Sequence, residues 1–275
     1  MPASRGSDRP RPDRFAGAHD IESGTAELIA DRTDPGGWSI IVNGVPSSYV
    51  HLGDPTRLDF EYMQWMGHVL DAAAPPGSAL PTVHIGGAGC TLALYVAATR
   101  PGSPQTVFEI DAALVTLMRQ AFGLRSVRGL RLKAMDGLAG LASLPAGHSA
   151  VVVRDAFDGA LVPPHLVTTG FYAEAARVLV AGGLYVGNVA DTAQVREARI
   201  EAASALEVFA HVALIAEPGQ LRGRRYGNVV LLASQAPLPE DALVRKLASG
   251  AVRARYVDPA RVKELVAGVK PRRSQ

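Results

Sequence analysis

The sequence predicts an α/β protein with a mostly parallel sheet and helices on both faces, and three observations lead to this prediction. From Thr82 to about residue 206, apolar runs of strand length alternate with segments of helical length, the pattern of βαβ units. The first apolar run ends in a glycine cluster, and a helical pattern starts at once. The last two apolar runs are joined by a connection too short for a crossover helix, so these strands should be antiparallel.

Composition narrows the class of protein. The chain has 275 residues, 48% of them hydrophobic, so it can bury a substantial core. Its formal net charge of +2 is too small to indicate nucleic acid, and its single cysteine excludes an intramolecular disulfide. No apolar run reaches the roughly 20 residues that cross a bilayer, and the N-terminus lacks the apolar core of a signal peptide. We therefore expect a cytoplasmic protein with no nucleic-acid or membrane partner.

The N-terminal region should contain an arm and a small β-element. Residues 1–21 are rich in Arg, Asp, Pro and Gly, which predicts a disordered arm. Within residues 22–60, two apolar runs flank Asn43-Gly44, the strongest short-range signal for a β-hairpin. Asp54-Pro55-Thr56 then opens a helix that ends near Pro75.

Residues 61–236 should form the main domain. We expect strands at residues 82–86, 105–110, 130–135, 149–154 and 183–189, and helices at residues 90–99, 112–122, 170–181 and 192–206. Residues 208–216 and 227–234 should close the sheet as an antiparallel hairpin. Five parallel strands followed by such a hairpin are typical of the seven-stranded, Rossmann-like AdoMet-transferase sheet. Residues 237–275 should form a C-terminal helical tail.

The segment from His84 to Asp111 predicts a nucleoside ligand. Gly86, Gly87 and Gly89 lie between an apolar run and a helix, where the backbone can approach a ligand beside free helix N–H groups. About twenty residues later the second strand closes on Glu109. A carboxylate at this place can accept both hydroxyls of a ribose.

Carboxylates follow three successive strands. Glu109, Asp136 and Asp155 end the second, third and fourth strands of the main domain. The carboxyl ends of parallel strands meet at one edge of the sheet, so these side chains should converge. We expect Glu109 to bind the ribose, Asp136 an exocyclic adenine amine, and Asp155 to face the reacting group. A helix N-cap or an ordinary loop residue is the alternative for each.

Over roughly residues 47–234 the sequence resembles the spermidine synthase (polyamine aminopropyltransferase) family. The family's GGGDGG block corresponds to residues 86–91, its E-I-D to residues 109–111, its D-G to Asp136-Gly137 and its D-S-S-D to residues 155–158. The family's tyrosine before the first helix matches Tyr62, and its aromatic pair matches Phe171-Tyr172.

The resemblance implies a homodimeric transferase that moves an aminopropyl-type group from a sulfonium donor to an amine. It implies that Asp155 deprotonates the amine and that Asp158 binds it. The co-substrate would be S-adenosylmethionine or its decarboxylated form, without a metal. The implied catalytic residues are Asp155, Asp158 and Tyr62, and the implied cofactor-binding residues are Gly86, Gly87, Gly89, Glu109, Asp136 and Gly137.

Two departures from the family bear on the donor. Gly89 replaces the aspartate that holds the amine of decarboxylated AdoMet in the family, and Met63 replaces a glutamine. We expect Gly89 to remove a negative charge and to expose its backbone N–H, which suits a carboxylate better than an ammonium. The usual preference for decarboxylated AdoMet should therefore be lost.

Other residues offer weaker signals. Cys90 is interpreted as a small residue packed beside the glycine turn, and Arg222, Arg224 and Arg225 as a solvated loop. The seven histidines show no metal-ligand spacing. Two further functions stay open: a methyltransferase that uses ordinary AdoMet, and a nucleoside-binding protein without turnover.

Overall fold

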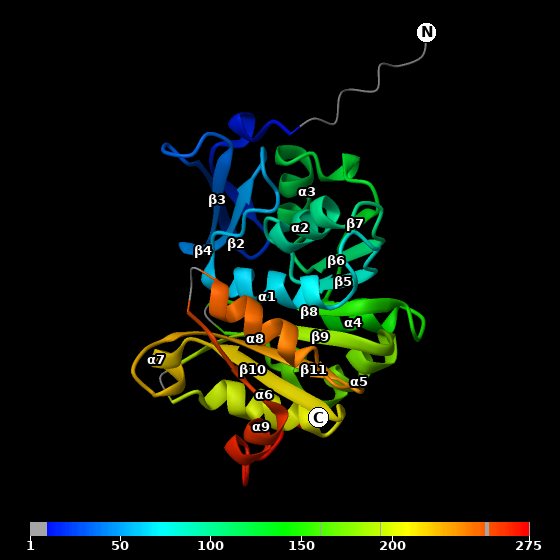
Figure 1. Ribbon diagram of the computed structural model, residues 1–275. Coiled ribbons are helices and arrows are strands. Elements are labelled where there is room, and N and C mark those ends of the chain that lie inside the picture. Colours follow the sequence, from blue (N-terminus) through cyan, green and yellow to red (C-terminus); the bar gives the residue numbers. More distant parts are fainter. Residues whose placement is uncertain (1–9, 160, 193, 251–252, 275) are drawn as a thin grey trace.

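A four-stranded antiparallel sheet precedes the main domain (Figure 1). The computed structural model describes residues 10–159, 161–192, 194–250 and 253–274. A short 3-10 helix, η1 (Pro12–Phe15), leads into β1 (Gly17–Ile21), β2 (Gly24–Ala30), β3 (Gly37–Val42) and β4 (Val45–His51). Asn43 and Gly44 both have positive φ, 50° and 77°, as a type I′ hairpin turn requires. The predicted hairpin is confirmed as β3–β4.

The prediction of a disordered arm is wrong for its last part. Residues 17–21 form β1, which pairs with β2 from Gly17 opposite Leu28 to Ile21 opposite Gly24. Composition misled the prediction, because pairing to a neighbouring strand and burial of Ile21 order this segment. Residues 1–9 of the predicted arm lie outside the described residues.

The main sheet in the described chain has eight strands in the order β12-β10-β11-β9-β8-β5-β6-β7. Five of them are parallel, and β11 is antiparallel to both β9 and β10. The seven expected strands are present with the expected directions, and β12 adds an eighth strand at the edge next to β10. The strands are β5 (Thr82–Ile85), β6 (Gln105–Glu109), β7 (Leu130–Ala134), β8 (Ser149–Arg154), β9 (Leu179–Asp191), β10 (His211–Ala216), β11 (Gly227–Ser234) and β12 (Arg255–Val257).

The C-terminal region is not only helical. It contains α8 (Glu240–Ser249) and α9 (Pro259–Leu265), but between them β12 pairs with β10 and extends the main sheet by one strand. A three-residue strand carries too few positions for a period-2 pattern to be recognised. The described part of the chain contains no helix that is both long and apolar enough to cross a membrane.

Helices cover both faces of the main sheet (Figure 1). Val151 and Val153 of β8 pack toward α1 and α8, whereas Val152 packs toward the opposite layer. The N-terminal sheet packs against α2 and α3, where Ile40 and Val50 share an apolar cluster with Cys90. The helices of the main domain are α1 (Glu61–Ala72), α2 (Thr91–Thr99), α3 (Ala112–Ala121), α4 (Gly137–Ala142), α5 (Thr169–Val178), α6 (Arg196–Leu206) and the short α7 (Pro218–Leu221).

Candidate functional site

The glycine turn lies between β5 and α2. Gly86 has φ +84°, and a Cβ there would fall 2.2 Å from the carbonyl oxygen of Asp155. Glycine is therefore required both by the backbone conformation and by the close approach of the β8 end. Cys90 ends the turn in a left-handed conformation and caps α2. Burial raises the pKa of its thiol to about 12, so Cys90 acts as a small packed residue, as its sequence position indicated.

Glu109 reaches the glycine turn from the end of β6. Its Oε2 accepts hydrogen bonds from the backbone N–H of Gly87 at 2.8 Å and of Ala88 at 3.3 Å. The structure thus brings together two features that the sequence placed more than twenty residues apart. This carboxylate lies at the edge where a ribose would be bound in a fold of this kind.

Asp155 directly follows β8 and is held from two sides. The Tyr62 hydroxyl on α1 donates to its Oδ2 at 3.2 Å, and the Asn188 amide on β9 donates to its Oδ1 at 2.9 Å. Burial raises the pKa of Asp155, against the lowering effect of these two hydrogen bonds and of the neighbouring Arg154. A carboxyl group with a raised pKa is better suited to accept a proton than an ordinary surface aspartate.

Asp158 differs from Asp155 in its surroundings. It is exposed, and its backbone pairs with Leu161, with Asp158 N donating to Leu161 O at 2.8 Å. The loop therefore has its own local structure, but the Asp158 side chain is not held inside the site. Its predicted role in binding the amine stays a prediction.

Asp136 and Gly137 begin α4, beyond the end of β7. Asp136 caps the helix by accepting from Ala139 N at 2.9 Å, and its second oxygen lies 2.7 Å from Nε2 of His165. Burial acts to raise the pKa of Asp136, but these hydrogen bonds outweigh it, so the pKa lies below its ordinary value. A Cβ at Gly137 would fall 2.2 Å from Ile85 Cγ2, so close packing alone accounts for the glycine. The adenine contact proposed for Asp136 stays a prediction.

Gly89 is covered by the N-terminal sheet, and one expectation from the sequence is therefore wrong. Its N–H donates to Ser48 Oγ at 3.0 Å, so it is not exposed for a ligand carboxylate. A Cβ at Gly89 would fall 2.8 Å from Ser48 Cβ and 2.9 Å from Val50 Cγ2. The hydroxyl of Thr91 donates to the Tyr49 carbonyl at 2.9 Å and adds a second bond between this sheet and α2. Strand β4 therefore leaves no room for a side chain at position 89, where the family's motif has an aspartate.

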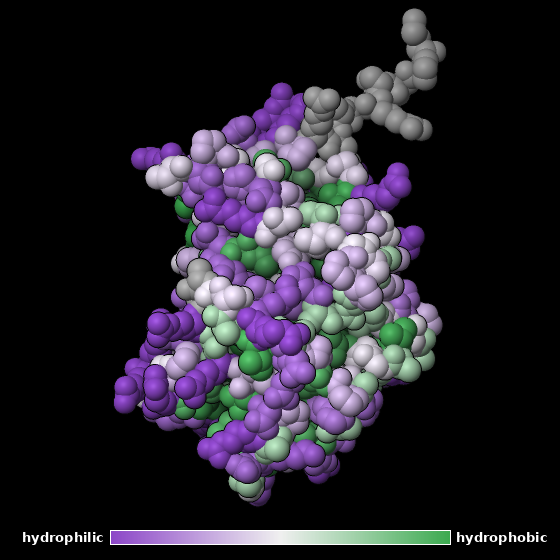
Figure 2. All heavy atoms as spheres, viewed as in Figure 1, coloured by the Kyte–Doolittle hydropathy of each residue, from purple (hydrophilic) through white to green (hydrophobic). Residues whose placement is uncertain are grey.

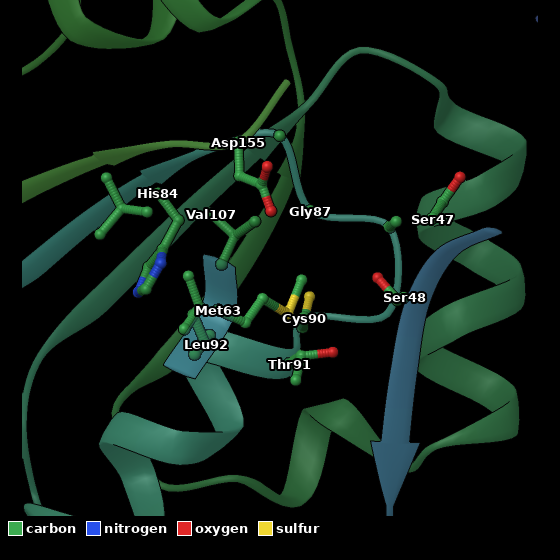
Figure 3. A pocket seen from close by; sticks show the side chains of 14 residues that line it. Ser47, Ser48, Met63, His84, Gly87, Cys90, Thr91, Leu92, Val107 and Asp155 are labelled. Carbon is green, nitrogen blue, oxygen red and sulfur yellow. The ribbon is translucent and has the colours of Figure 1, made fainter. Parts of the chain in front are cut away.

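A small cavity of about 40 Å³ lies beside the glycine turn. Figure 3 shows Met63 and Cys90 on one side of it, Ser48 on another, and Asp155 beside Gly87. Its other side-chain lining includes Leu92, Val107, Val153, Thr91, Ser47 and His84. Burial lowers the pKa of His84 to about 4, so this imidazole is uncharged at neutral pH, and Asp155 is the acidic side chain among the described residues that line the cavity.

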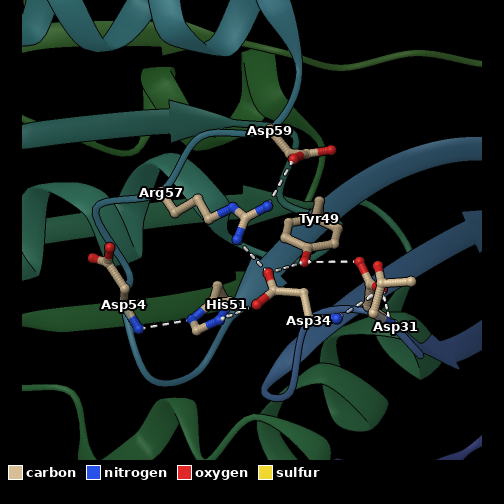
Figure 4. Close-up of polar contacts among 8 residues, drawn as sticks. Asp31, Asp34, Tyr49, His51, Asp54, Arg57 and Asp59 are labelled. Atoms are coloured by element: carbon tan, nitrogen blue, oxygen red, sulfur yellow. Dashed lines mark hydrogen bonds and ion pairs between the residues drawn. The ribbon is translucent and has the colours of Figure 1, made fainter.

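A polar cluster connects the N-terminal sheet to the segment that leads into α1 (Figure 4). The Tyr49 hydroxyl donates to Asp34 at 2.9 Å and to Asp31 at 3.2 Å. The Arg57 guanidinium pairs with Asp34, and His51 lies 3.3 Å from the same carboxylate. These contacts fix the approach to α1, and α1 in turn carries Tyr62 into the site.

Sequence reasoning missed Asn188 and Ser48. Asn188 lies in the apolar run of β9 and is 1% exposed, and a buried amide among valines was the one available signal of a specific partner. Ser48 lies in β4, and nothing near it in the sequence indicates that it meets a glycine 41 residues away.

No model of a known protein family matches the chain, and no curated protein matches it. Among solved structures, it is similar to a probable spermidine synthase from Corynebacterium glutamicum ATCC 13032, with 38% sequence identity and a TM-score of 0.88 over 94% of this chain and 96% of that one.

Three more distant structures share the fold. A spermidine synthase from Thermotoga maritima has 14% identity and a TM-score of 0.62, over 92% of this chain and 87% of that one. A spermidine synthase in complex with the transition state analogue AdoDATO has 15% identity and a TM-score of 0.61, with the same coverage. Human methyltransferase-like protein 13 in complex with SAH has 20% identity and a TM-score of 0.52, over 68% of this chain and 90% of that one.

The relative from Corynebacterium matches nearly the whole of both chains at an identity well above that of the other three. The glycine turn, Glu109 and the paired Asp155 lie at the sheet edge where an AdoMet-type transferase binds its ligand. The chain belongs to the spermidine synthase family and is a transferase with the AdoMet-type fold.

Proposed function

We propose that this transferase binds an AdoMet-type nucleoside at the glycine turn and moves an alkyl group from its sulfonium to an amine. The observation that carries the proposal is the Asp155 carboxyl group, held by Tyr62 and Asn188 beside the turn and partly desolvated there. The spermidine synthase neighbour in complex with AdoDATO and the methyltransferase-like neighbour in complex with SAH support a donor of this class.

Asp155 would act as the general base. An amine reaches the site mostly as an ammonium ion and must lose a proton before its lone pair can attack. Asp155 would take that proton. The nitrogen then forms a C–N bond to the carbon next to the sulfonium, while the C–S bond breaks and its electron pair stays on sulfur. The leaving product is an uncharged thioether nucleoside, and the two hydrogen bonds to Asp155 keep its oxygens in place for the attack.

The nucleoside would lie along the ends of β5, β6 and β7. Glu109 at the end of β6 would accept the ribose hydroxyls. Ile110 is 67% exposed and Met135 is 37% exposed, and each directly follows a strand at this edge. These two side chains would pack against the flat base. Asp136 would lie beside its amino group.

A methyl group is the second candidate for the transferred group. In the space where the family's aspartate holds an ammonium, this chain has Gly89 covered by Ser48 and Val50. That arrangement offers no charge to distinguish decarboxylated AdoMet from AdoMet. From the resemblance we also expect an amine acceptor and a homodimer.

The test is an assay of both donors. Purified protein is incubated with decarboxylated AdoMet or AdoMet and a panel of diamines, and products are measured by mass spectrometry. Methylthioadenosine with an aminopropylated amine supports the proposal, and S-adenosylhomocysteine with a methylated amine supports the second candidate. The Asp155→Asn variant should lose turnover by about 100-fold, as expected for a lost general base. Absence of both products from a nucleoside-bound, folded protein would contradict alkyl transfer and leave a binding function.

A further inference from the structure

A fully buried ion pair lies beneath the end of β8. Arg154, the last residue of this strand, is 0% exposed, and its Nη2 lies 2.7 Å from Oε2 of Glu201 on α6. Its Nε donates to the Tyr185 hydroxyl at 2.9 Å, and the Tyr172 hydroxyl donates to the same Glu201 oxygen at 2.9 Å. The network therefore joins β8, β9, α5 and α6.

Stability alone is a weak explanation for this pair. Removing two charges from water costs about as much as their attraction returns, and apolar replacements of similar volume are often as stable. The hydrogen bonding is also incomplete, because Nη1 of Arg154 is buried without a partner among the described residues. A costly, incompletely satisfied cation in a core calls for a reason other than packing.

The position of the pair supplies that reason. Arg154 directly precedes Asp155 and its side chain meets Glu201 of α6, whereas the Asp155 carboxyl meets Tyr62 of α1. Between the two charges lies protein interior, in which a charge acts over a longer distance than in water. We propose that Arg154 is a positioning residue for the reaction: its buried charge, oriented by Glu201, sets the proton affinity of Asp155. The effect on catalysis rests on the function proposed above, whereas the effect of Arg154 on the proton affinity of Asp155 does not.

The other groups around Asp155 cannot replace this charge. Tyr62 from α1 and Asn188 from β9 are uncharged donors, and burial keeps the pKa of Tyr62 well above its ordinary value. His84 and Cys90 from β5 and the glycine turn are uncharged at neutral pH. Glu109 on β6 and Asp158, in the loop after β8, are acidic residues and cannot supply a positive charge. Arg154 is therefore the cation placed to favour the carboxylate within the described part of the site.

The experiment measures the proton affinity of Asp155 directly. The carboxyl carbon of Asp155 is followed by ¹³C NMR against pH, and its signal is assigned by its absence in Asp155→Asn. In the Arg154→Met/Glu201→Gln double variant, which removes both charges and keeps an acceptor for Tyr172, the pKa of Asp155 should rise by about one unit. In Glu201→Gln alone, the Arg154 charge is unopposed, so the pKa should fall.

A matched control comes from α5. Arg177 and Glu174 form an ion pair at 2.8 Å within one helix, with side chains 34% and 32% exposed, and Arg177→Met/Glu174→Gln should leave the Asp155 titration unchanged. Where turnover is measured, the acidic limb of the kcat/KM profile should move with the NMR value in each variant.

An unchanged Asp155 pKa in a folded double variant, or shifts of the same sign in the two variants, would overturn the inference. If the double variant does not fold, the Glu201→Gln variant decides: a fall in the pKa of Asp155 supports the inference, and a rise or no change contradicts it. NMR shifts as predicted without any alkyl transfer would instead contradict the proposed function and leave the electrostatic role intact.

Discussion

The contact between the N-terminal sheet and the glycine turn should make Gly89 one of the least tolerant positions in the protein. Gly89 is buried, and a methyl group there would fall 2.8 Å from Ser48 Cβ, 2.9 Å from Val50 Cγ2 and 3.1 Å from Ile40 Cδ1. Real Cβ atoms essentially never approach within 3.0 Å, so β4 or the turn must shift. Overpacking of a closely packed interior typically costs about 1–3 kcal/mol.

A shift of β4 away from the turn would also lengthen the hydrogen bond from Gly89 N to Ser48 Oγ, now 3.0 Å. A lost hydrogen bond of this kind adds about 0.5–1.5 kcal/mol. We therefore expect Gly89→Ala to lower the free energy of unfolding by about 1.5–4.5 kcal/mol, the two costs taken together. Gly89→Asp, which introduces the family's residue, should cost more because it also buries a charge.

Urea denaturation followed by circular dichroism measures this change. The control is Gly219→Ala, where a Cβ would meet only flexible side-chain atoms of Glu217 and Arg225 at 3.3 Å or more. That substitution should change stability by less than about 0.5 kcal/mol. A Gly89→Ala variant as stable as the wild type would refute the packing argument and show that position 89 can accommodate a side chain.

Three further predictions follow from the site. Asp158→Asn should reduce turnover much less than Asp155→Asn, because Asp158 is exposed, and equal losses in a steady-state assay would contradict the assignment of the base. Competition calorimetry should show AdoMet and decarboxylated AdoMet binding within tenfold of each other, about 1.4 kcal/mol, and a larger preference for the decarboxylated form would contradict the argument from Gly89. The pKa of His84 lies at about 4 rather than 6.5, so the folded protein binds fewer protons than the unfolded chain between these pH values. The free energy of unfolding should therefore fall by about 2–3 kcal/mol between pH 6.5 and pH 4.5. Urea titrations should show a smaller fall in His84→Gln, and an equal fall would contradict this reasoning.

Much of the main domain could be predicted because its signals are local. The strands are short apolar runs that alternate with segments of helical length, and this local pattern is typical of a mostly parallel sheet. Glu109 and Asp155 could be assigned to one edge because each directly follows a strand. The β3–β4 turn was equally predictable, since Asn43-Gly44 specifies its backbone conformation.

The parts that could not be predicted depend on contacts between distant segments. Asn188 meets Asp155 across 33 positions, and Ser48 meets Gly89 across 41. An arginine at the end of a strand is usually exposed to solvent. Arg154 is buried because the fold brings Glu201 next to it. For Asp136, the sequence offered a ligand contact or a helix cap, and the structure shows the cap.

The most direct test of the account is whether Glu109 anchors a nucleoside at the glycine turn. Isothermal titration calorimetry of methylthioadenosine with the wild type should show one saturable site. Glu109→Ala should weaken binding by about 1.5–3 kcal/mol, the range for hydrogen bonds to a charged group, whereas Glu174→Ala on the distant helix α5 should leave affinity unchanged. Circular dichroism would confirm that both variants are folded. Equal affinity of wild type and folded Glu109→Ala, or no binding by the wild type, would contradict a nucleoside site at this edge of the sheet.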